Sequence, residues 1–219
     1  MNKDKPKDNG YKIVTPILGF LFRLFYNPKI VGKENIPSEG AIILACNHKH
    51  VYDQCPIAIS TKRVIHWMAK KEYFDGKLAW FFKLSGCIPV DRGSKDDTSK
   101  EVALEILKDN GAIGIFPEGT RNKTYDTVML PLKYGVVSMA SKTDAYIVPC
   151  AVTGDYKFRS KNLMVRFGVP FKVGKKDYVE ATAELEADIK ALMEENLKAT
   201  NRTMEEELQS RNQDQKKKQ

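Results

Sequence analysis

Six short apolar runs, separated by polar stretches, restrict the fold of this sequence more than any other feature. The runs occupy residues 41–46, 64–69, 86–90, 112–116, 145–152 and 162–168. Each is continuous rather than alternating, which is typical of strands covered on both faces of a sheet. Helical patterns follow several runs, over residues 97–110, 132–141 and 177–200. We therefore expect an α/β fold, a single layered domain with a mostly parallel or mixed central sheet flanked by helices.

The two ends of the chain differ from this central part. Residues 1–10 and 201–219 are dominated by charged and polar side chains, and we predict a disordered tail at each end. Between the tails we place an N-terminal helical segment at 11–28 and one globular domain at 29–200. A chain of 219 residues is long enough to bury one sizeable core.

The N-terminal segment predicts an amphipathic helix over residues 16–26, with Thr15 as its cap and Pro16 in its first position. Eleven residues rise only about 16 Å, roughly half of a bilayer core. The aromatic side chains Phe20, Phe22 and Phe25 favour a helix that lies in the membrane interface. The alternative is a core helix with one exposed stripe.

The net charge of +8 indicates polyanionic partners: nucleic acid, an acidic membrane surface or acidic substrates. Much of the excess lies in residues 61–83, where six basic side chains accompany two acidic ones. Trp80, Phe81 and Phe82 stand between two lysines there, a pattern that suits the headgroup boundary of a bilayer. A core helix with two snorkelling lysines is the alternative. The sequence has no zinc-finger, helix-turn-helix or RNP pattern, so we expect no nucleic-acid partner.

Two of the three histidines lie just after the first apolar run, in the segment Asn-His-Lys-His-Val-Tyr-Asp at residues 47–53. In a regular helix His48 and Asp53 would point about 140° apart, so they meet only if the chain turns between them. A carboxylate on one imidazole nitrogen fixes the tautomer and frees the other nitrogen as a base. We interpret His50 as a loop residue and His66, inside an apolar run, as a core residue.

Two further segments follow apolar runs. Phe-Pro-Glu-Gly-Thr-Arg at residues 116–121 signals a turn, and the planar guanidinium of Arg121 suits phosphate oxygens. The alternative there is a surface turn with a salt bridge between Glu118 and Arg121. The segment 86–92 is a strand that ends in Asp-Arg, or else an ordinary exit from strand to loop.

Taken in order, Asn-His-x4-Asp, Gly-x5-Arg, Phe-Pro-Glu-Gly-Thr-Arg and Val-Pro-Cys-Ala resemble the four-block pattern of the glycerophospholipid acyltransferases. The likeness is greatest to the bacterial-type 1-acyl-sn-glycerol-3-phosphate acyltransferases. It covers roughly residues 30–170, so we expect residues 29–200 to be an acyltransferase domain. Two positions depart from the pattern: Asn122 replaces the usual Ser or Thr, and Pro89 lies inside the second block.

The resemblance implies transfer of a fatty acyl group from a thioester, acyl-CoA or acyl-carrier protein, to the 2-hydroxyl of lysophosphatidate. It assigns His48 as the general base and Asp53 as the group that orients it. Arg121 would hold the acceptor phosphate on a loop shaped by Glu118 and Gly119. Arg92, the basic residue of the second block, would help to hold the same phosphate. The resemblance implies no cofactor and no metal.

Several alternatives stay open. Within the class, the acceptor is glycerol 3-phosphate or another lysolipid; outside it stands a non-catalytic membrane-binding module. A metal-dependent hydrolase would need more ligands than His48, His50 and Asp53 supply. Cys46 and Cys55 flank the first block and raise the idea of a covalent acyl-cysteine. No apolar run approaches the roughly 20 residues of a membrane span, so we predict peripheral or monotopic attachment at the cytoplasmic face of the cell membrane, on an anionic surface.

Overall fold

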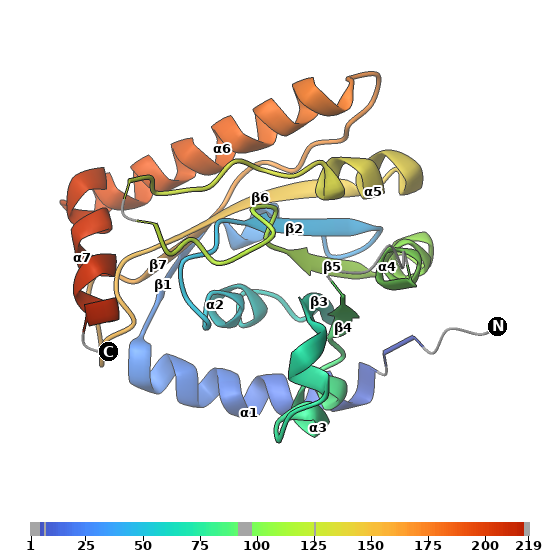
Figure 1. The fold of residues 1–219 in the computed structure, drawn as a ribbon, viewed down its shortest axis with the longest axis horizontal. Helices are drawn as coiled ribbons and strands as arrows, with labels where there is room; N and C mark the ends of the chain where they lie inside the picture. Colours follow the sequence, from blue (N-terminus) through green and yellow to red (C-terminus); the bar gives the residue numbers. More distant parts are fainter. Residues whose placement is uncertain (1–4, 7, 92–97, 125, 217–219) are drawn as a thin grey trace.

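The central sheet of this computed structural model has seven strands among the described residues, which are 5–6, 8–91, 98–124 and 126–216. The spatial order of the strands is β1-β7-β6-β2-β5-β3-β4 (Figure 1). Their bounds are Lys29–Val31, Ile42–Cys46, Ile65–Lys70, Ile88–Val90, Ala112–Ile115, Tyr146–Thr153 and Met164–Phe167 for β1 to β7. Neighbouring strands are parallel except for the antiparallel pair β6 and β7. The expected α/β domain with a mixed sheet is confirmed.

Both faces of the sheet are covered, and β2 shows why its sequence is continuously apolar. All five of its residues are buried. Ile43 and Ala45 join a core beneath α4 (Thr98–Lys108), α5 (Gly135–Thr143) and α6 (Tyr178–Ala199). Ile42, Leu44 and Cys46 join a second core on the opposite face. A strand with both faces covered has no polar face, hence the unbroken run.

The second face is covered by α1 (Asp8–Tyr26) and α2 (Gln54–Ala58), with α3 (Ala79–Leu84) beside α1 (Figure 1). The short 3₁₀ helix η2 (Lys71–Phe74) leads from β3 towards α3, and another, η1 (Lys33–Asn35), follows β1. None of the helices in the described part of the chain has a stretch long and apolar enough to cross a bilayer.

The N-terminal helix is longer than the sequence suggests. It begins at Asp8, so Pro16 lies inside it and Thr15 is not its cap. Gly10 is buried against Leu84 of α3, and a Cβ at Gly10 would lie 2.1 Å from the Leu84 carbonyl oxygen. Packing against α3 therefore extends the helix before its proline, which sequence propensity alone does not indicate. The prediction that the segment up to residue 10 is a disordered tail is wrong for residues 8–10.

The C-terminal prediction is wrong as well. Residues 204–216, expected within a charged disordered tail, form helix α7 (Met204–Lys216). One of its acidic residues, Glu207, is fully buried against the rest of the domain. A buried carboxylate holds the segment in place although the helix as a whole is strongly polar. By contrast, Asp177 caps α6 as predicted, and accepts a hydrogen bond from the backbone N–H of Glu180.

Three strands end side by side at one edge of the sheet. β2 lies between β5 and β6 and runs parallel to both. Their carboxyl ends therefore lead into neighbouring loops, which carry residues 47–53, 116–122 and 154–162. Loops at the carboxyl ends of parallel strands are the usual place for a binding site in an α/β sheet.

Candidate active site

His48 and Asp53 form a hydrogen-bonded pair at the end of β2. His48 lies on the loop after the strand, and Asp53 directly precedes α2. Nδ1 of His48 is 3.0 Å from Oδ2 of Asp53. The carboxylate keeps the proton on Nδ1, so Nε2 is the nitrogen that can accept another. The chain turns between the two residues, as their spacing requires if they are to meet.

The carboxylate of Asp53 is fully buried and accepts four hydrogen bonds. Besides His48, the backbone N–H groups of Lys49 and His50 donate to Oδ2, each at 2.7 Å. The Tyr156 hydroxyl donates to Oδ1 at 2.8 Å. Burial opposes ionisation of Asp53, but the hydrogen bond and charge of His48 outweigh it and hold the pKa of this carboxyl below its ordinary value of 3.8. The group is therefore an anion at neutral pH, and supports an imidazolium on His48.

A second buried carboxylate, Glu118, ties the first sequence block to the third. It is 2% exposed. Its Oε1 accepts the backbone N–H of His48 at 2.5 Å, and its Oε2 accepts that of Leu130 at 2.7 Å. The backbone N–H of Asn122 donates to the His48 carbonyl at 2.7 Å. The alternative of a surface turn is therefore wrong, because Glu118 shapes the loop from inside.

The turn at Gly119 precedes Arg121, a cation that has no partner among the described residues. Gly119 has φ +72°, and a Cβ there would lie 2.8 Å from Cε and Nζ of Lys133. The positive φ suits glycine, and the Lys133 side chain lies directly against this position. Arg121 follows and is half-buried, with no hydrogen bond or ion pair to any residue that the structure describes. Its guanidinium is available to a ligand. Arg92 lies outside the described residues.

Aromatic rings fix the plane of the His48 imidazole. It stacks on Phe116 with ring centroids 3.9 Å apart and an interplanar angle of 10°. Phe116 in turn stacks on Trp67, with centroids 5.3 Å apart. Gly114 allows the indole to lie there, since a Cβ at Gly114 would approach it to 2.5 Å. The imidazole is thus held by a ring on its face and a carboxylate at its edge.

His48 opens onto a cavity of about 1810 Å³ that extends between α1, α2 and α3. This is larger than the roughly 300–1,000 Å³ of common small-molecule sites. Apolar side chains of α1 and α3 line its far part. The basic side chains at the cavity are Lys70, Lys77, Arg121, Lys123, Lys133 and Arg159. Glu72 is the acidic one among the described lining residues, and it pairs with Lys70. The arrangement suits an anionic, amphipathic ligand.

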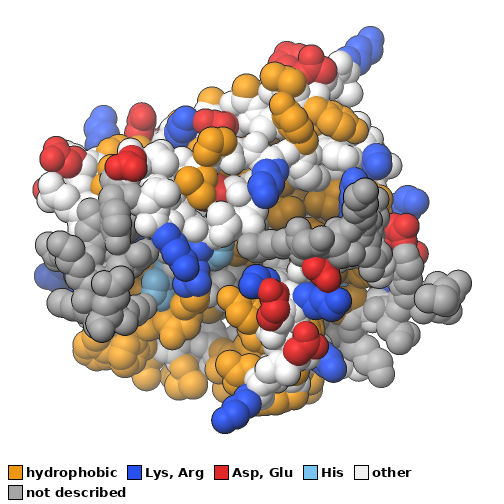
Figure 2. Space-filling view, viewed as in Figure 1, with side chains coloured by type: hydrophobic (Ala, Val, Ile, Leu, Met, Phe, Trp, Pro, Cys, Tyr) orange, Lys and Arg blue, Asp and Glu red, His pale blue; other side chains and the backbone are white. Residues whose placement is uncertain are grey.

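Apolar side chains of α1 and of the α3 region are also exposed, and several of them line the cavity as well. Of the expected membrane residues, Phe20 is 67% exposed, Phe25 50% and Trp80 63%. We call the surface that they form with their exposed neighbours the α1–α3 apolar surface. Its members are Ile13, Ile17, Leu18, Phe20, Leu21, Leu24, Phe25, Leu78, Trp80 and Leu84. Figure 2 shows hydrophobic side chains gathered along this lower edge of the molecule. A contiguous patch of this kind indicates an interaction surface.

Three of the expected membrane residues lie elsewhere. Phe22 is 9% exposed and packs on Tyr26 and Tyr156, so its assignment to the membrane is wrong. It lies on the face of α1 that turns towards the sheet. Phe81 and Phe82 are half-buried and line the cavity rather than the outer surface.

The remaining histidines and the two cysteines near the first sequence block are held in packing contacts or buried. His50 stacks on Tyr156, and His66 is buried with Nδ1 2.8 Å from the Gly86 carbonyl oxygen, which confirms both interpretations. Burial raises the pKa of Cys46 well above its ordinary value and that of Cys55 to about 12. Neither thiol is a nucleophile at neutral pH, so an acyl-cysteine is disfavoured. Among the described residues no group of three acidic, histidine or cysteine side chains is arranged to hold a metal ion.

Tyr156 is the site residue that the sequence did not reveal. It lies 103 residues after Asp53, in the loop that follows β6. Burial, and then the Asp53 charge, raise the pKa of its hydroxyl well above 10.0, so it donates to Asp53 throughout the neutral range. Its position after an apolar run was the one available signal, since the loop contains no recognisable motif.

The sequence matches the model of a family described as Acyltransferase over residues 27–153. It is 35% identical over 146 residues to a 1-acyl-sn-glycerol-3-phosphate acyltransferase of Bacillus subtilis, covering 66% of this chain and 71% of that protein. It is 31% identical over 150 residues to one of Borreliella burgdorferi, covering 64% of this chain and 56% of that protein. For a Saccharomyces cerevisiae protein of the same name the identity is 33% over 129 residues, covering 57% of this chain and 42% of that protein.

Among solved structures, the 1-acyl-sn-glycerophosphate acyltransferase of Thermotoga maritima superimposes with a TM-score of 0.69. The superposition covers 89% of this chain and 83% of that one, at 22% sequence identity. At this identity the likeness concerns the fold, and it includes the flanking helices as well as the sheet.

The depressed pKa of Asp53 predicts how stability depends on pH. Its ionised form contributes stability that is complete above the unfolded-state value near 3.8 and is lost as the pH falls through the lower folded value. At pH 7 the free energy of unfolding of Asp53→Asn should therefore be about 1–3 kcal/mol lower than that of the unmodified protein. The difference from the unmodified protein should narrow only below about pH 4. Urea unfolding at a series of pH values measures this.

Exposed Asp75, also changed to Asn, is the matched control and should leave the curve unchanged. A gap between Asp53→Asn and the unmodified protein that stays constant down to pH 2 would contradict the assignment.

Proposed function

Because the chain belongs to the acyltransferase family, we propose that it transfers a fatty acyl group from a thioester to the free 2-hydroxyl of 1-acyl-sn-glycerol 3-phosphate, lysophosphatidate. The product is phosphatidate, a precursor of phospholipids. The observation that carries the proposal is the pair of His48 and Asp53 at the mouth of a basic and apolar cavity.

The reaction needs one proton to leave the acceptor and reach the departing thiol. Nε2 of His48 accepts the proton of the 2-hydroxyl as its oxygen attacks the thioester carbonyl carbon. Asp53 stabilises the imidazolium that forms. The tetrahedral intermediate then expels the thiolate, which takes the proton from His48, so an ester and a thiol are formed and the base is regenerated.

Arg121 is proposed to hold the phosphate of the acceptor. Its guanidinium has no other partner among the described residues and lies on the loop that Glu118 and Gly119 shape beside His48. Bidentate binding of a phosphate would place the acceptor hydroxyl relative to Nε2. Holding the two reactants together converts a bimolecular reaction into an effectively unimolecular one, a large part of catalysis. Arg92 stays a prediction.

The donor is proposed to be acyl-CoA or acyl-carrier protein. In both, a pantetheine arm joins the thioester to anionic groups at its far end, and the basic side chains around the cavity would attract these groups. The apolar part of the cavity, between α1 and α3, would take a fatty acyl chain. Arg63, one of the basic residues of segment 61–83, is not available for this, because its guanidinium donates to the carbonyls of Pro37, Gly40 and Asn110.

We propose a peripheral position on the cytoplasmic face of an anionic membrane, where the acceptor lipid resides. The α1–α3 apolar surface supports this because its exposed side chains come from α1 and the α3 region, which contact each other, and several of them also line the cavity. An amphipathic helix of this kind lies in the interface with its apolar side among the acyl chains. A lipid acceptor would then reach His48 from the membrane without crossing water.

Loss of the base should abolish most of the activity. His48→Ala should lower kcat by about 10²–10⁴-fold. The KM for lysophosphatidate should change little, since binding rests on other groups. Thiol release from acyl-CoA in mixed micelles measures both constants.

His50→Ala is the matched control, two residues along the same loop, and should retain kcat within a few-fold. Near-normal turnover in His48→Ala would show that the mechanism assigned here is wrong.

Arg121 should matter only when the acceptor bears a phosphate. Arg121→Ala should raise the KM for lysophosphatidate by about 10–100-fold, the loss expected for a charged hydrogen bond. Use of a 1-acylglycerol without phosphate should not change. Lys142→Ala removes an exposed charge on α5, outside the cavity, and should leave both acceptors unaffected. If Arg121→Ala retains its KM and kcat with lysophosphatidate, Arg121 does not bind the phosphate.

Membrane binding should depend on the α1–α3 apolar surface. Phe20→Ser combined with Trp80→Ser should weaken sedimentation with anionic liposomes by at least about tenfold, since burying each ring is worth about 1.5–3 kcal/mol. Val169→Ser is the control, because Val169 is 75% exposed but lies outside this surface. Equal binding by the double variant and the control would exclude this surface as the membrane contact.

A further inference from the structure

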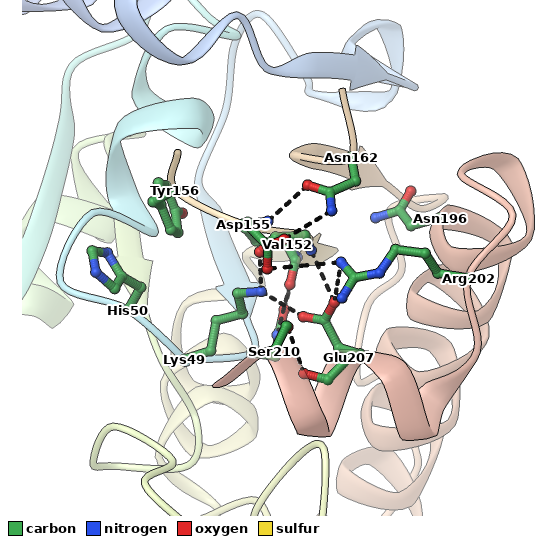
Figure 3. A network of polar contacts seen from close by, with 12 residues as sticks. Lys49, His50, Val152, Asp155, Tyr156, Asn162, Asn196, Arg202, Glu207 and Ser210 are labelled. Carbon is green, nitrogen blue, oxygen red and sulfur yellow. Dashed lines mark hydrogen bonds and ion pairs between the residues drawn. The ribbon is translucent and has the colours of Figure 1, made fainter. Parts of the chain in front are cut away.

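Lys49, next to the proposed base, points away from the cavity into a buried polar network (Figure 3). Its side chain is 5% exposed. The ammonium donates to the Gly154 carbonyl and to Oε1 of Glu207. A lysine that close to a proposed catalytic residue could be expected to bind an anionic substrate. Here its charge is used inside the protein.

Glu207 joins two loops with its two oxygens. It is fully buried, and while Oε1 accepts from Lys49, Oε2 accepts the backbone N–H of Gly154 at 3.1 Å. Gly154 has φ +85°, and a Cβ there would lie 2.0 Å from the Asn162 carbonyl oxygen. The conformation and the close contact here suit glycine alone, and Glu207 holds this backbone from the side of α7.

The second of these loops carries Tyr156, two residues beyond Gly154. The residue between them, Asp155, is held in the same network. Its carboxylate accepts a hydrogen bond from Asn162 at 2.9 Å and lies 3.9 Å from the Arg202 guanidinium. Tyr156 then donates to Asp53, which closes a ring of contacts from Lys49 through Glu207 to the oxygen of Asp53 that His48 does not use.

The more buried charges of the network balance, and the exposed Lys157 lies 3.6 Å from Asp155 at its edge. Lys49 and Arg202 are cations, Glu207 and Asp155 anions, and the Arg202 guanidinium lies 3.1 Å from Oε2 of Glu207. Burial opposes ionisation of Asp155, but the Asn162 hydrogen bond and the Arg202 charge outweigh it and lower the pKa of this carboxyl. Buried charges are tolerated when each has a partner, and removal of one partner leaves the other charge buried and unpaired.

The helix that supplies Glu207 lies beyond the part of the chain that matches the family, residues 27–153. We propose that Glu207 is a positioning residue for acyl transfer: through Lys49 and Gly154 it fixes the loops that carry His48 and Tyr156 relative to Asp53. The proposal rests on the proposed function for its kinetic readout. It gives α7 a role in the active site although the helix lies outside the cavity.

Glu207→Gln tests the proposal kinetically. It should lower kcat by about 10–100-fold, as a shift of about 1 Å in a catalytic group does, while the KM values for donor and acceptor stay within about twofold. Glu205→Gln, a change at an exposed residue two positions before Glu207 on α7, should behave as the unmodified protein. A rise in KM with kcat preserved would overturn the proposal.

A double-mutant cycle tests whether Glu207 acts through Lys49. Lys49→Met, Glu207→Gln and the combination should each lower kcat to a similar extent, since all three break the same link. The combination removes one cation together with one anion, so the Lys49 charge is not left unpaired and Arg202 keeps Asp155 as its partner. It therefore serves if Glu207→Gln alone does not fold. A combined variant that folds with unmodified kcat would overturn the proposal, and so would additive losses.

A readout without substrate separates this proposal from the proposed function. The Nδ1 proton of His48, hydrogen-bonded to Asp53, should give a downfield proton NMR signal that Asp53→Asn should abolish. In Glu207→Gln, or in the combined variant, the signal should broaden or disappear, while in Glu205→Gln it should not change. An unchanged signal would overturn the proposal. If the signal responds as expected but the unmodified protein transfers no acyl group, the proposed function fails and the positioning role stands.

Discussion

A carboxylate without access to water must find all of its hydrogen-bond donors inside the protein, and Asp53 imposes this requirement on the whole site. Its four donors come from the imidazole of His48, two successive backbone N–H groups of the same loop and the Tyr156 hydroxyl. The loop after β2 can satisfy Asp53 only by curling around it, which brings His48 to Nδ1. The orientation of the proposed base thus follows from the burial of its partner, because a buried carboxylate left without hydrogen-bond donors is strongly destabilising.

Glu118 extends the same constraint to the neighbouring strand. It too is buried, and it accepts the backbone N–H of His48. With Glu207 on the opposite side of the loop, three buried carboxylates from three segments hold a stretch of about six residues. Each lies near the carboxyl ends of β2, β5 and β6, where parallel neighbours bring their loops together. Such rigid support suits a base that must meet a hydroxyl at hydrogen-bonding distance, and it leaves Nε2, Arg121 and the apolar cavity for the substrates.

The sequence predicted much of this architecture because continuous apolar runs and capped helices are local signals. Six of the seven strands fall within a few residues of the predicted runs, whereas the edge strand β1 (Lys29–Val31) was not predicted. The pairing of His48 with Asp53 follows from one segment. The features that the sequence did not predict depend on contacts between residues far apart in the chain. The extension of α1 to Asp8 depends on Gly10 packing against Leu84. Helix α7 depends on the burial of one glutamate in an otherwise polar stretch. The contact of Tyr156 with Asp53 depends on the position of β6 next to β2, which brings the loop after β6 close to the loop after β2. Phe22 was misassigned because an aromatic cluster does not reveal which side of a helix faces the core.

The central claim is that the cavity beside His48 binds a phosphorylated monoacyl lipid and acylates its 2-hydroxyl. The most direct measurement offers the purified protein one acyl-CoA with lysophosphatidate, glycerol 3-phosphate and uncharged or zwitterionic lysolipids in parallel, and identifies the products by mass spectrometry. The account predicts phosphatidate, with lysophosphatidate used at least about tenfold more efficiently than any of the others. The uncharged and zwitterionic lysolipids lack the free phosphate that Arg121 would bind, and glycerol 3-phosphate lacks the acyl chain that the apolar cavity would bury. Thiol release that does not require lysophosphatidate, or a clear preference for glycerol 3-phosphate or another lysolipid, would contradict it.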